Sequence, residues 1–269
     1  MRGFVYILLT GLVFLFSSCE QIVDIDLNDA DPRIVIEGVI SSKPTIPQYV
    51  KVSLTTSYFD TGQASGITDA LVIVTEDGAL VDTFSHQLPG YYVSNKILSG
   101  KVGSTYKLSV YYKGELYEAM STMAAVAPID SLTANYRAID MRYEEAGHYV
   151  TIALQEPPGI GNFYYWLYYS NDTLMNYGDM IIASDEMADG VYINNIEFSY
   201  PQQPGDTVRV EQYSLSEEGY NFLRILADQE EFGDLFDTPP ANIIGNISNN
   251  GIGFFSASDV SESVLVIQP

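Results

Sequence analysis

The chain has 269 residues, a formal net charge of −23 and 21 tyrosines. A surface this acidic repels nucleic acid and the anionic faces of membranes, so we exclude nucleic-acid binding. The length leaves room for one large or two ordinary domains. Tyrosine suits half-buried strands, where the ring packs and the hydroxyl group stays hydrated, so the composition favours β-structure.

The N-terminus combines one basic residue, Arg2, with an apolar segment at 4–16 and the only cysteine of the chain, Cys19. The apolar segment has the length of a signal-peptide core and is too short to span a bilayer. Two small residues precede Cys19, and this order resembles the lipobox of bacterial lipoproteins. The resemblance implies that a signal peptide, 1–18, is removed and that the thiol group is acylated. The alternative, an ordinary signal peptide with an incidental cysteine, would leave an unpaired thiol in an oxidising compartment.

Residues 19–31 form an acidic segment that we interpret as a solvated tether. Its alternating Asp24, Asp26 and Asn28 match the start of a calcium-binding loop. The match then fails, because such a loop needs glycine at its sixth position and glutamate at its twelfth. Asp29 and Val35 stand at those two positions.

The segment 32–124 contains about seven short strands separated by turns, which is typical of an Ig-like or transthyretin-like β-sandwich. The predicted strands are residues 33–40, 49–55, 70–75, 80–84, 91–93, 105–112 and 116–121. The sequences EDG at 76–78 and Lys113-Gly114 predict tight hairpin turns. Residues 122–131 lose the alternation, and we interpret them as a linker to a second domain, 125–269.

The second domain is predicted to be a further β-sandwich with one amphipathic helix near the C-terminus. Its predicted strands are residues 131–137, 149–154, 163–170, 180–183, 196–200 and 207–214, and a last strand follows the turn NNG at 249–251. Apolar residues around Tyr220 share one helical face and predict a helix at 216–229. Ser214 and Glu217 fit a capping box, and Ser216 is a second candidate for the cap.

The most aromatic segment of the chain is FYYWLYYS at 163–170. In a strand, Tyr164, Trp166 and Tyr168 point to one face. One face of this strand must pack into the core, while the other either binds a ligand or partner or is covered by the helix. We favour the covered alternative, because a lone amphipathic helix must bury its apolar side. Tyr164, Trp166 and Tyr168 are therefore a candidate ligand face or packing face.

The sequence contains no recognisable catalytic or metal-binding motif. His86 and His148 fall in different predicted domains, and we expect both in solvent-facing loops rather than in a zinc site or a catalytic triad. Asp185, Glu186 and Asp189 are interpreted as a solvated turn, with calcium binding as the less favoured alternative. We expect no catalytic residues, no metal and no cofactor.

Several segments, in this order along the chain, resemble Bacteroidota lipoproteins that are grouped under a domain of unknown function. These segments are RIVIEGVIS at 33–41, GSTYKLSVYYKGELYEA at 103–119, APIDSL at 127–132, the D-x-x-x-x-G pattern of 185–190, GDTVRVEQYSLSEEGYNFL at 205–223 and LFDTPPANIIGNISNNGIGFFSAS at 235–258. Such lipoproteins are often encoded beside TonB-dependent outer-membrane receptors. The resemblance implies a lipoprotein of the outer membrane, at the cell surface or on the periplasmic face, and it supplies no catalytic residues.

We therefore expect a non-catalytic lipoprotein that assists a TonB-dependent receptor in ligand capture or uptake. A surface adhesin or structural module is one alternative, because β-sandwiches on a lipid tether fit that role as well. A glycan-binding or glycan-hydrolysing protein is another. An open cleft with two carboxylates roughly 5–10 Å apart would favour hydrolysis.

Overall fold

The computed structural model describes residues 31–46, 48–56, 64–230 and 244–269. Residues from Pro32 to Pro269 form one compact unit. It is mostly β-structure, as predicted. The predicted signal peptide at 1–18, Cys19 and almost all of the tether at 19–31 lie outside the described residues. Within the described part, none of the helical structure has the length and apolar character needed to cross a membrane.

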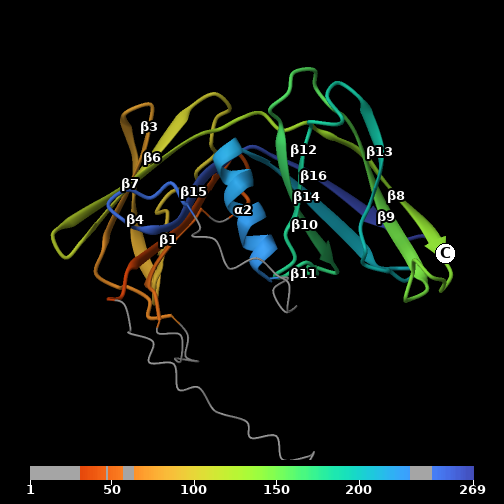
Figure 1. The fold of residues 1–269 in the computed structure, drawn as a ribbon, viewed down its shortest axis with the longest axis horizontal. Helices are drawn as coiled ribbons and strands as arrows, with labels where there is room; N and C mark the ends of the chain where they lie inside the picture. Colours follow the sequence, from red (N-terminus) through yellow and green to blue (C-terminus); the bar gives the residue numbers. More distant parts are fainter. Residues whose placement is uncertain (1–30, 47, 57–63, 231–243) are drawn as a thin grey trace, which may run out of the picture. The chain divides into compact units, whose positions relative to one another are not determined.

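The first group of strands forms one eight-stranded sheet (Figure 1). In spatial order its strands are β15 (Ile252–Ser258), β1 (Ile34–Ser41), β2 (Tyr49–Leu54), β5 (Tyr91–Val93), β4 (Ala79–Leu88), β3 (Leu71–Glu76), β6 (Thr105–Tyr112) and β7 (Glu115–Thr122). Strand β6 shows why these segments form strands: Tyr106, Leu108 and Val110 alternate into the core. Every pairing is antiparallel except that of β1 with β15, which is parallel.

Both predicted hairpin turns are confirmed. Asp77 and Gly78 join β3 to β4 with φ angles of 49° and 83°, and Lys113 and Gly114 join β6 to β7 with 48° and 85°. Two successive positive φ angles are typical of the type I′ turn, whose twist matches that of the flanking strands.

The eight-stranded sheet brings its two end strands together in a barrel-like arrangement. The backbone N–H of Ala257 on β15 donates to the hydroxyl group of Ser121 on β7 at 2.9 Å. The side chain of Asn246 bonds the backbone N–H and C=O of Phe255 and also donates to the C=O of Met120 on β7. These bonds enclose the first hydrophobic core.

The second group consists of two sheets packed around a second core. One sheet has the order β11 (Thr173–Leu174), β10 (Phe163–Ser170), β14 (Thr207–Leu215) and β16 (Val260–Val266), and β12 (Ile181–Ser184) also pairs with β10. The other has the order β13 (Tyr192–Glu197), β9 (Gly147–Gln155) and β8 (Ile129–Arg137). Strand β13 lies earlier than the predicted strand 196–200, and β16 was not predicted at all.

Helix α2 (Glu217–Glu230) begins where predicted, with Ser216 as its cap. The hydroxyl group of Ser216 accepts from the N–H of Gly219 at 3.1 Å, whereas Ser214 belongs to β14. Tyr220 stacks on Phe163 of β10 with ring centroids 5.0 Å apart. Phe222 stacks on Phe254 of β15 at 5.1 Å. The prediction that this helix packs on a sheet is therefore confirmed, and its rings contact strands of both groups.

The predicted boundary between 124 and 125 needs one correction, because β15 completes the first sheet and buries Phe255 and Ala257 in the first core. A parallel neighbour of β1 needs a long crossover connection, and here that neighbour is β15, more than 200 residues later in the chain. The predicted linker is also held in place: the N–H of Val126 donates to the carboxylate of Asp259 at 3.1 Å. Ser214 donates to the C=O of Ala124 at 2.7 Å and accepts from the N–H of Asp259 at 2.9 Å.

Candidate functional site

The candidate site is a cavity of about 360 Å³ that opens between β12 and β13. These strands lie at the edges of two different sheets, and in the described part of the chain no ladder joins them. On the opposite side of the sandwich, the N–H of Ile129 at the start of β8 donates to the hydroxyl group of Ser261 on β16. The two sheets are thus tied together on one side and leave an opening on the other. The volume falls within the range typical of small-molecule sites.

The predicted aromatic face is the packing face of β10. Tyr164, Trp166 and Tyr168 are all buried in the second core, with exposed fractions of 4%, 2% and 0%. Tyr164 and Trp166 also line the cavity, and the indole N–H of Trp166 donates to the side chain of Gln212 at 2.8 Å. Tyr168 packs instead against Phe198 and Tyr200. Two of the three predicted residues therefore reach the cavity.

Glu156 is the residue that sequence reasoning missed. It follows β9 in the loop EPPGIGN, yet its side chain is fully buried. The hydroxyl group of Tyr164 lies 3.0 and 2.8 Å from its two carboxyl oxygens. Burial raises the pKa of Glu156, and the negative charge of Asp185 adds to the rise, against the lowering effect of the Tyr164 hydrogen bond.

Asp185 lines the same cavity but uses its carboxylate to hold a loop. It accepts hydrogen bonds from the backbone N–H groups of Gly161 and Asn162, each at 3.0 Å, and from the Asn162 amide at 3.1 Å. Burial acts to raise the pKa of Asp185, but these bonds to the charged form outweigh it and lower the pKa. Asp189 similarly accepts from the N–H of Gly159 at 2.5 Å. The acidic turn thus fastens the loop 156–162 to the loop 185–191.

The rim of the cavity and the joined loops carry exposed apolar side chains. Met187, Val191 and Tyr192 line the opening, with exposed fractions of 100%, 52% and 50%, and Ile160 projects from the loop 156–162. Exposed apolar groups gathered beside a pocket are typical of binding surfaces.

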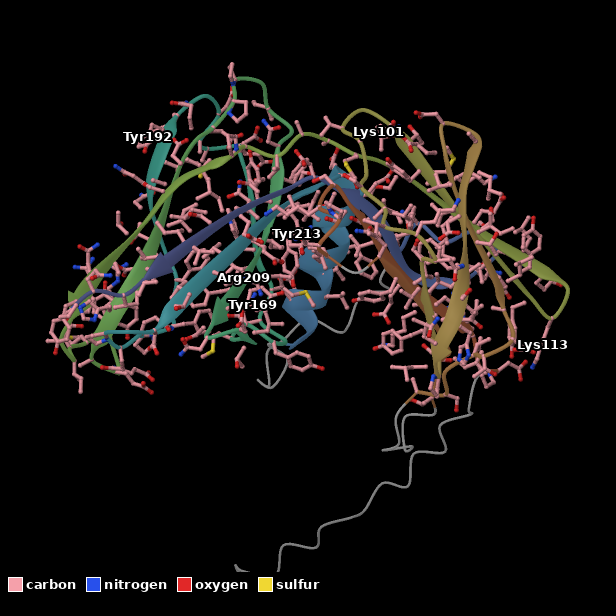
Figure 2. The ribbon with its side chains drawn as sticks, turned by 180° about the vertical axis from the view of Figure 1, so that it is seen from behind. Lys101, Lys113, Tyr169, Tyr192, Arg209 and Tyr213 are labelled. Carbon is pink, nitrogen blue, oxygen red and sulfur yellow. The ribbon has the colours of Figure 1, made fainter. Side chains whose placement is uncertain are left out.

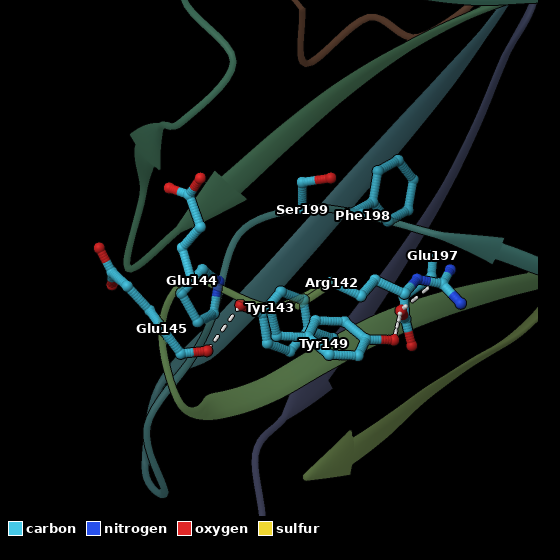
Figure 3. Close-up of a pocket in the computed structure, with 9 residues that line it drawn as sticks. Arg142, Tyr143, Glu144, Glu145, Tyr149, Glu197, Phe198 and Ser199 are labelled. Atoms are coloured by element: carbon cyan, nitrogen blue, oxygen red, sulfur yellow. Dashed lines mark hydrogen bonds and ion pairs between the residues drawn. The ribbon is translucent and has the colours of Figure 1, made fainter. Parts of the chain in front are cut away.

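A second cavity, of about 410 Å³, lies at the loop between β8 and β9 (Figure 3). Glu197 accepts from the hydroxyl group of Tyr143 at 2.6 Å and from Arg137 at 2.9 Å. The guanidinium groups of Arg137 and Arg142 both lie over the Tyr143 ring. Burial acts to raise the pKa of Glu197, and the bonds from Tyr143 and Arg137 lower it overall. Since this carboxylate is already paired, we interpret the cluster as a structural fastening of the loop.

The other face of β10 carries Phe163, Tyr165, Leu167 and Tyr169, all half-buried, and charged residues of the neighbouring β14 lie beside it. Arg209 lies over the ring of Tyr169, 3.8 Å from its centroid, and pairs with the buried Glu211. Tyr213 donates its hydroxyl hydrogen to Glu211 at 2.8 Å. Figure 2 shows Arg209, Tyr169 and Tyr213 next to one another. Helix α2 covers the Phe163 end of this face.

The two histidines lie on strands, not in the predicted loops. His86 belongs to β4 and is exposed, and His148 belongs to β9 with its ring against Tyr136. Loop placement was wrong because local polarity does not distinguish a loop from the outer side of a strand. Within the described ranges, no group of three or more His, Cys, Asp or Glu residues has the geometry to hold a metal ion.

A scan against protein families matches residues 20–263 to a family described as Domain of unknown function (DUF4249). The chain belongs to this family. The match covers nearly all of the chain after the apolar N-terminal segment, and thus both groups of strands and the cavity between β12 and β13. A comparison with curated proteins finds no match.

The local sequence around Glu156 does not predict that its side chain is buried. Both prolines of EPPGIGN follow it, and Pro158 lies near Gly190 of the facing loop. A glutamate beside prolines and glycines is normally solvated. Only the packing of the two loops over the core buries it.

Proposed function

We propose that this chain is a non-catalytic lipoprotein of the outer membrane in a Bacteroidota-type cell, anchored through Cys19. In this proposal it assists a TonB-dependent receptor by capturing a ligand in the cavity between β12 and β13. The observation that carries the capture role is a cavity of ligand size with apolar walls, buried carboxyl groups and an exposed apolar rim. The proposed lipid anchor rests on the apolar N-terminal segment and the lone cysteine. The proposed partnership with a receptor rests on the family resemblance.

Charge supports a capture role outside the lipid surface. The part of the chain from 125 to 269 has 22 acidic residues and four arginines, a formal charge of −18. Anionic lipid repels such a surface, whereas cationic ligands or basic partners are attracted to it. The acidic tether at 19–31 would act in the same direction and hold the protein off the membrane.

We rank glycan hydrolysis below ligand capture. A glycosidase needs two carboxyl groups that can reach the bond to be cleaved, one as acid and one as nucleophile or base. Asp185 is already committed to three hydrogen bonds with its loop, so Glu156 would lack a second catalytic group. A surface adhesin or structural module remains the main alternative.

The experiment that tests the proposal is a mild-detergent pull-down of the tagged native lipoprotein from its own outer membrane, followed by mass spectrometry. Stoichiometric recovery of a TonB-dependent barrel supports the accessory role. Recovery of the lipoprotein alone, while a known receptor complex survives the same detergent, counts against it and favours the adhesin alternative. The matched control is the Cys19→Ser protein, which is predicted to be absent from the membrane fraction.

A further inference from the structure

We propose that the cavity between β12 and β13 selects ligands that carry a protonated amine on an apolar body. This inference rests on the proposed capture role of the same cavity and names the chemical class of the ligand. It does not depend on which receptor, if any, receives that ligand.

The first step is that, in the part of the chain that the structure describes, Glu156 lacks a basic partner, unlike two comparable glutamates. In the same part of the chain, Glu197 pairs with Arg137 and Glu211 with Arg209. Among the described residues, no lysine or arginine forms an ion pair with Glu156. A carboxylate offers about four acceptor positions, and the hydroxyl group of Tyr164 supplies one hydrogen.

The second step concerns the free energy of burying the Glu156 carboxylate without a positive charge beside it. An ionised carboxylate buried without a cation is unfavourable, and this shifts the protonation equilibrium of the group toward the neutral form. The raised pKa of Glu156 has this cause. A ligand ammonium group would supply the missing positive charge beside a buried carboxyl group, where such a pair is screened less than at the surface. Where Glu156 is protonated, binding converts its carboxyl group to carboxylate, and one proton leaves to solvent.

The charged and titratable groups around Glu156 all favour a cation. Tyr164 faces it from β10, Asp185 and Asp189 from the loop 185–191, and Tyr192 from β13 lines the same cavity. None of these side chains carries a positive charge. The anionic Asp185 opposes ionisation of Glu156 and would add attraction for an ammonium group.

The walls fit the apolar body of such a ligand. Besides the rings of Tyr164 and Trp166, the lining includes Leu154, Ile193 and Ile196. Aromatic rings also attract cations through their faces. A neutral ligand could use the apolar walls but would leave the carboxyl group without a partner, which is the basis for selection.

The test uses the fluorescence of Trp166, which is the only tryptophan of the chain and lines the cavity. The soluble protein from residue 20 onward is titrated with phenethylamine, with its neutral analogue 2-phenylethanol and with the anion 3-phenylpropanoate. We expect the amine to bind about tenfold or more tightly than the alcohol, as for a hydrogen bond to a charged group. Equal binding of amine and alcohol, or no response to the amine, overturns the inference.

The deciding variant is Glu156→Gln, which retains the shape of the side chain and an acceptor for Tyr164. It should bind amine and alcohol equally, while Glu37→Gln, a carboxyl-to-amide change on β1, should keep the preference of the parent. A preserved preference in Glu156→Gln overturns the inference. If that variant does not fold, calorimetry of the parent in buffers of different ionisation enthalpy decides instead: amine binding near the pKa of Glu156 must release protons.

The amine could belong to a free small molecule or to a lysine side chain of a protein partner. Titration with a blocked tripeptide, acetyl-Gly-Lys-Gly-amide, and with its Nε-acetylated form distinguishes the two sources. Preference for the lysine peptide over phenethylamine indicates a protein partner, and the reverse indicates a free amine. If neither phenethylamine nor the lysine peptide binds, this inference is overturned. The receptor proposal is not affected by that result, because the pull-down of the native lipoprotein tests it separately.

Discussion

The hydroxyl group of Tyr164 lies within hydrogen-bond distance of both carboxyl oxygens of Glu156, and both side chains are buried. Tyr164 stands on β10, and Glu156 follows β9 of the opposing sheet, so this contact joins the two layers of the second sandwich. It also places a carboxyl group in the lining of the cavity, next to the rings of Tyr164 and Trp166. Stability and ligand choice should therefore both respond to changes at these two residues.

Tyr164→Phe should destabilise the fold by about 1–3 kcal/mol, because it leaves a buried carboxyl group without its hydroxyl partner. The matched control is Tyr168→Phe on the same strand. The hydroxyl group of Tyr168 is buried and has no hydrogen-bond partner among the described residues, so its removal should be neutral or stabilising. Urea unfolding measures both variants. Equal losses in the two would show that the Tyr164 contact contributes nothing specific.

The stability of the protein should depend on pH through Glu156. Burial raises the pKa of this carboxyl group in the folded state above the ordinary value of 4.5. The folded protein then binds the proton more tightly than the unfolded chain, so stability from this group is complete below the ordinary pKa and is lost as the pH rises through the raised pKa.

Glu156→Gln removes this dependence. The melting temperature of the variant, relative to the parent, should therefore rise as the pH increases from the ordinary value of 4.5 through the raised pKa of Glu156. Circular dichroism melts at a series of pH values from about pH 4 upward provide the measurement. A constant difference between variant and parent at every pH contradicts the prediction.

Ser214→Ala should weaken the junction between the two groups of strands by about 1–3 kcal/mol. Its buried hydroxyl group bonds Ala124 in the predicted linker and Asp259 between β15 and β16, and alanine leaves both backbone groups without this partner. Ser85→Ala removes an exposed bond to Asn95 and should change stability by less than about 0.5 kcal/mol. Chemical denaturation followed by two different spectroscopic signals measures this effect. A loosened junction should let the two groups of strands unfold in separate transitions.

Gly253→Ala should disrupt the pairing of β15 with β1. Gly253 has a φ angle of 106°, and a β-carbon there would collide with the backbone C=O of Ile36 on the neighbouring strand. Gly114→Ala tests backbone conformation alone, because φ is 85° and nothing lies within 4 Å. The Gly114→Ala control should lower the stability of the protein by about 1 kcal/mol. A loss in Gly253→Ala no larger than in the control would mean that β15 adapts freely.

Cys19→Ser should release the protein from membranes, because acyl chains attached to Cys19 are the proposed anchor. Membrane fractionation with an immunoblot provides the measurement, and Ser18→Ala, which keeps a small residue before the cysteine, should stay in the membrane fraction. Normal membrane recovery of Cys19→Ser would contradict the lipoprotein proposal.

Local sequence determined most of the strands, the turn at Lys113-Gly114 and the helix that begins after Ser216, because alternation, turn chemistry and capping act between neighbouring residues. It also placed Tyr164, Trp166 and Tyr168 on one face of a strand, since that spacing is a property of the strand itself. It did not reveal β16, whose apolar residues fall on both faces.

Tertiary structure alone decided the parallel pairing of β15 with β1 and the burial of Glu156. The register of two strands more than 200 residues apart depends on the whole sheet, not on either segment. Whether a loop glutamate is hydrated or buried depends on what packs over it, and here the loop 185–191 does so. The candidate site therefore could not be read from the sequence, because the burial of its carboxyl group depends on contacts between segments that are distant along the chain.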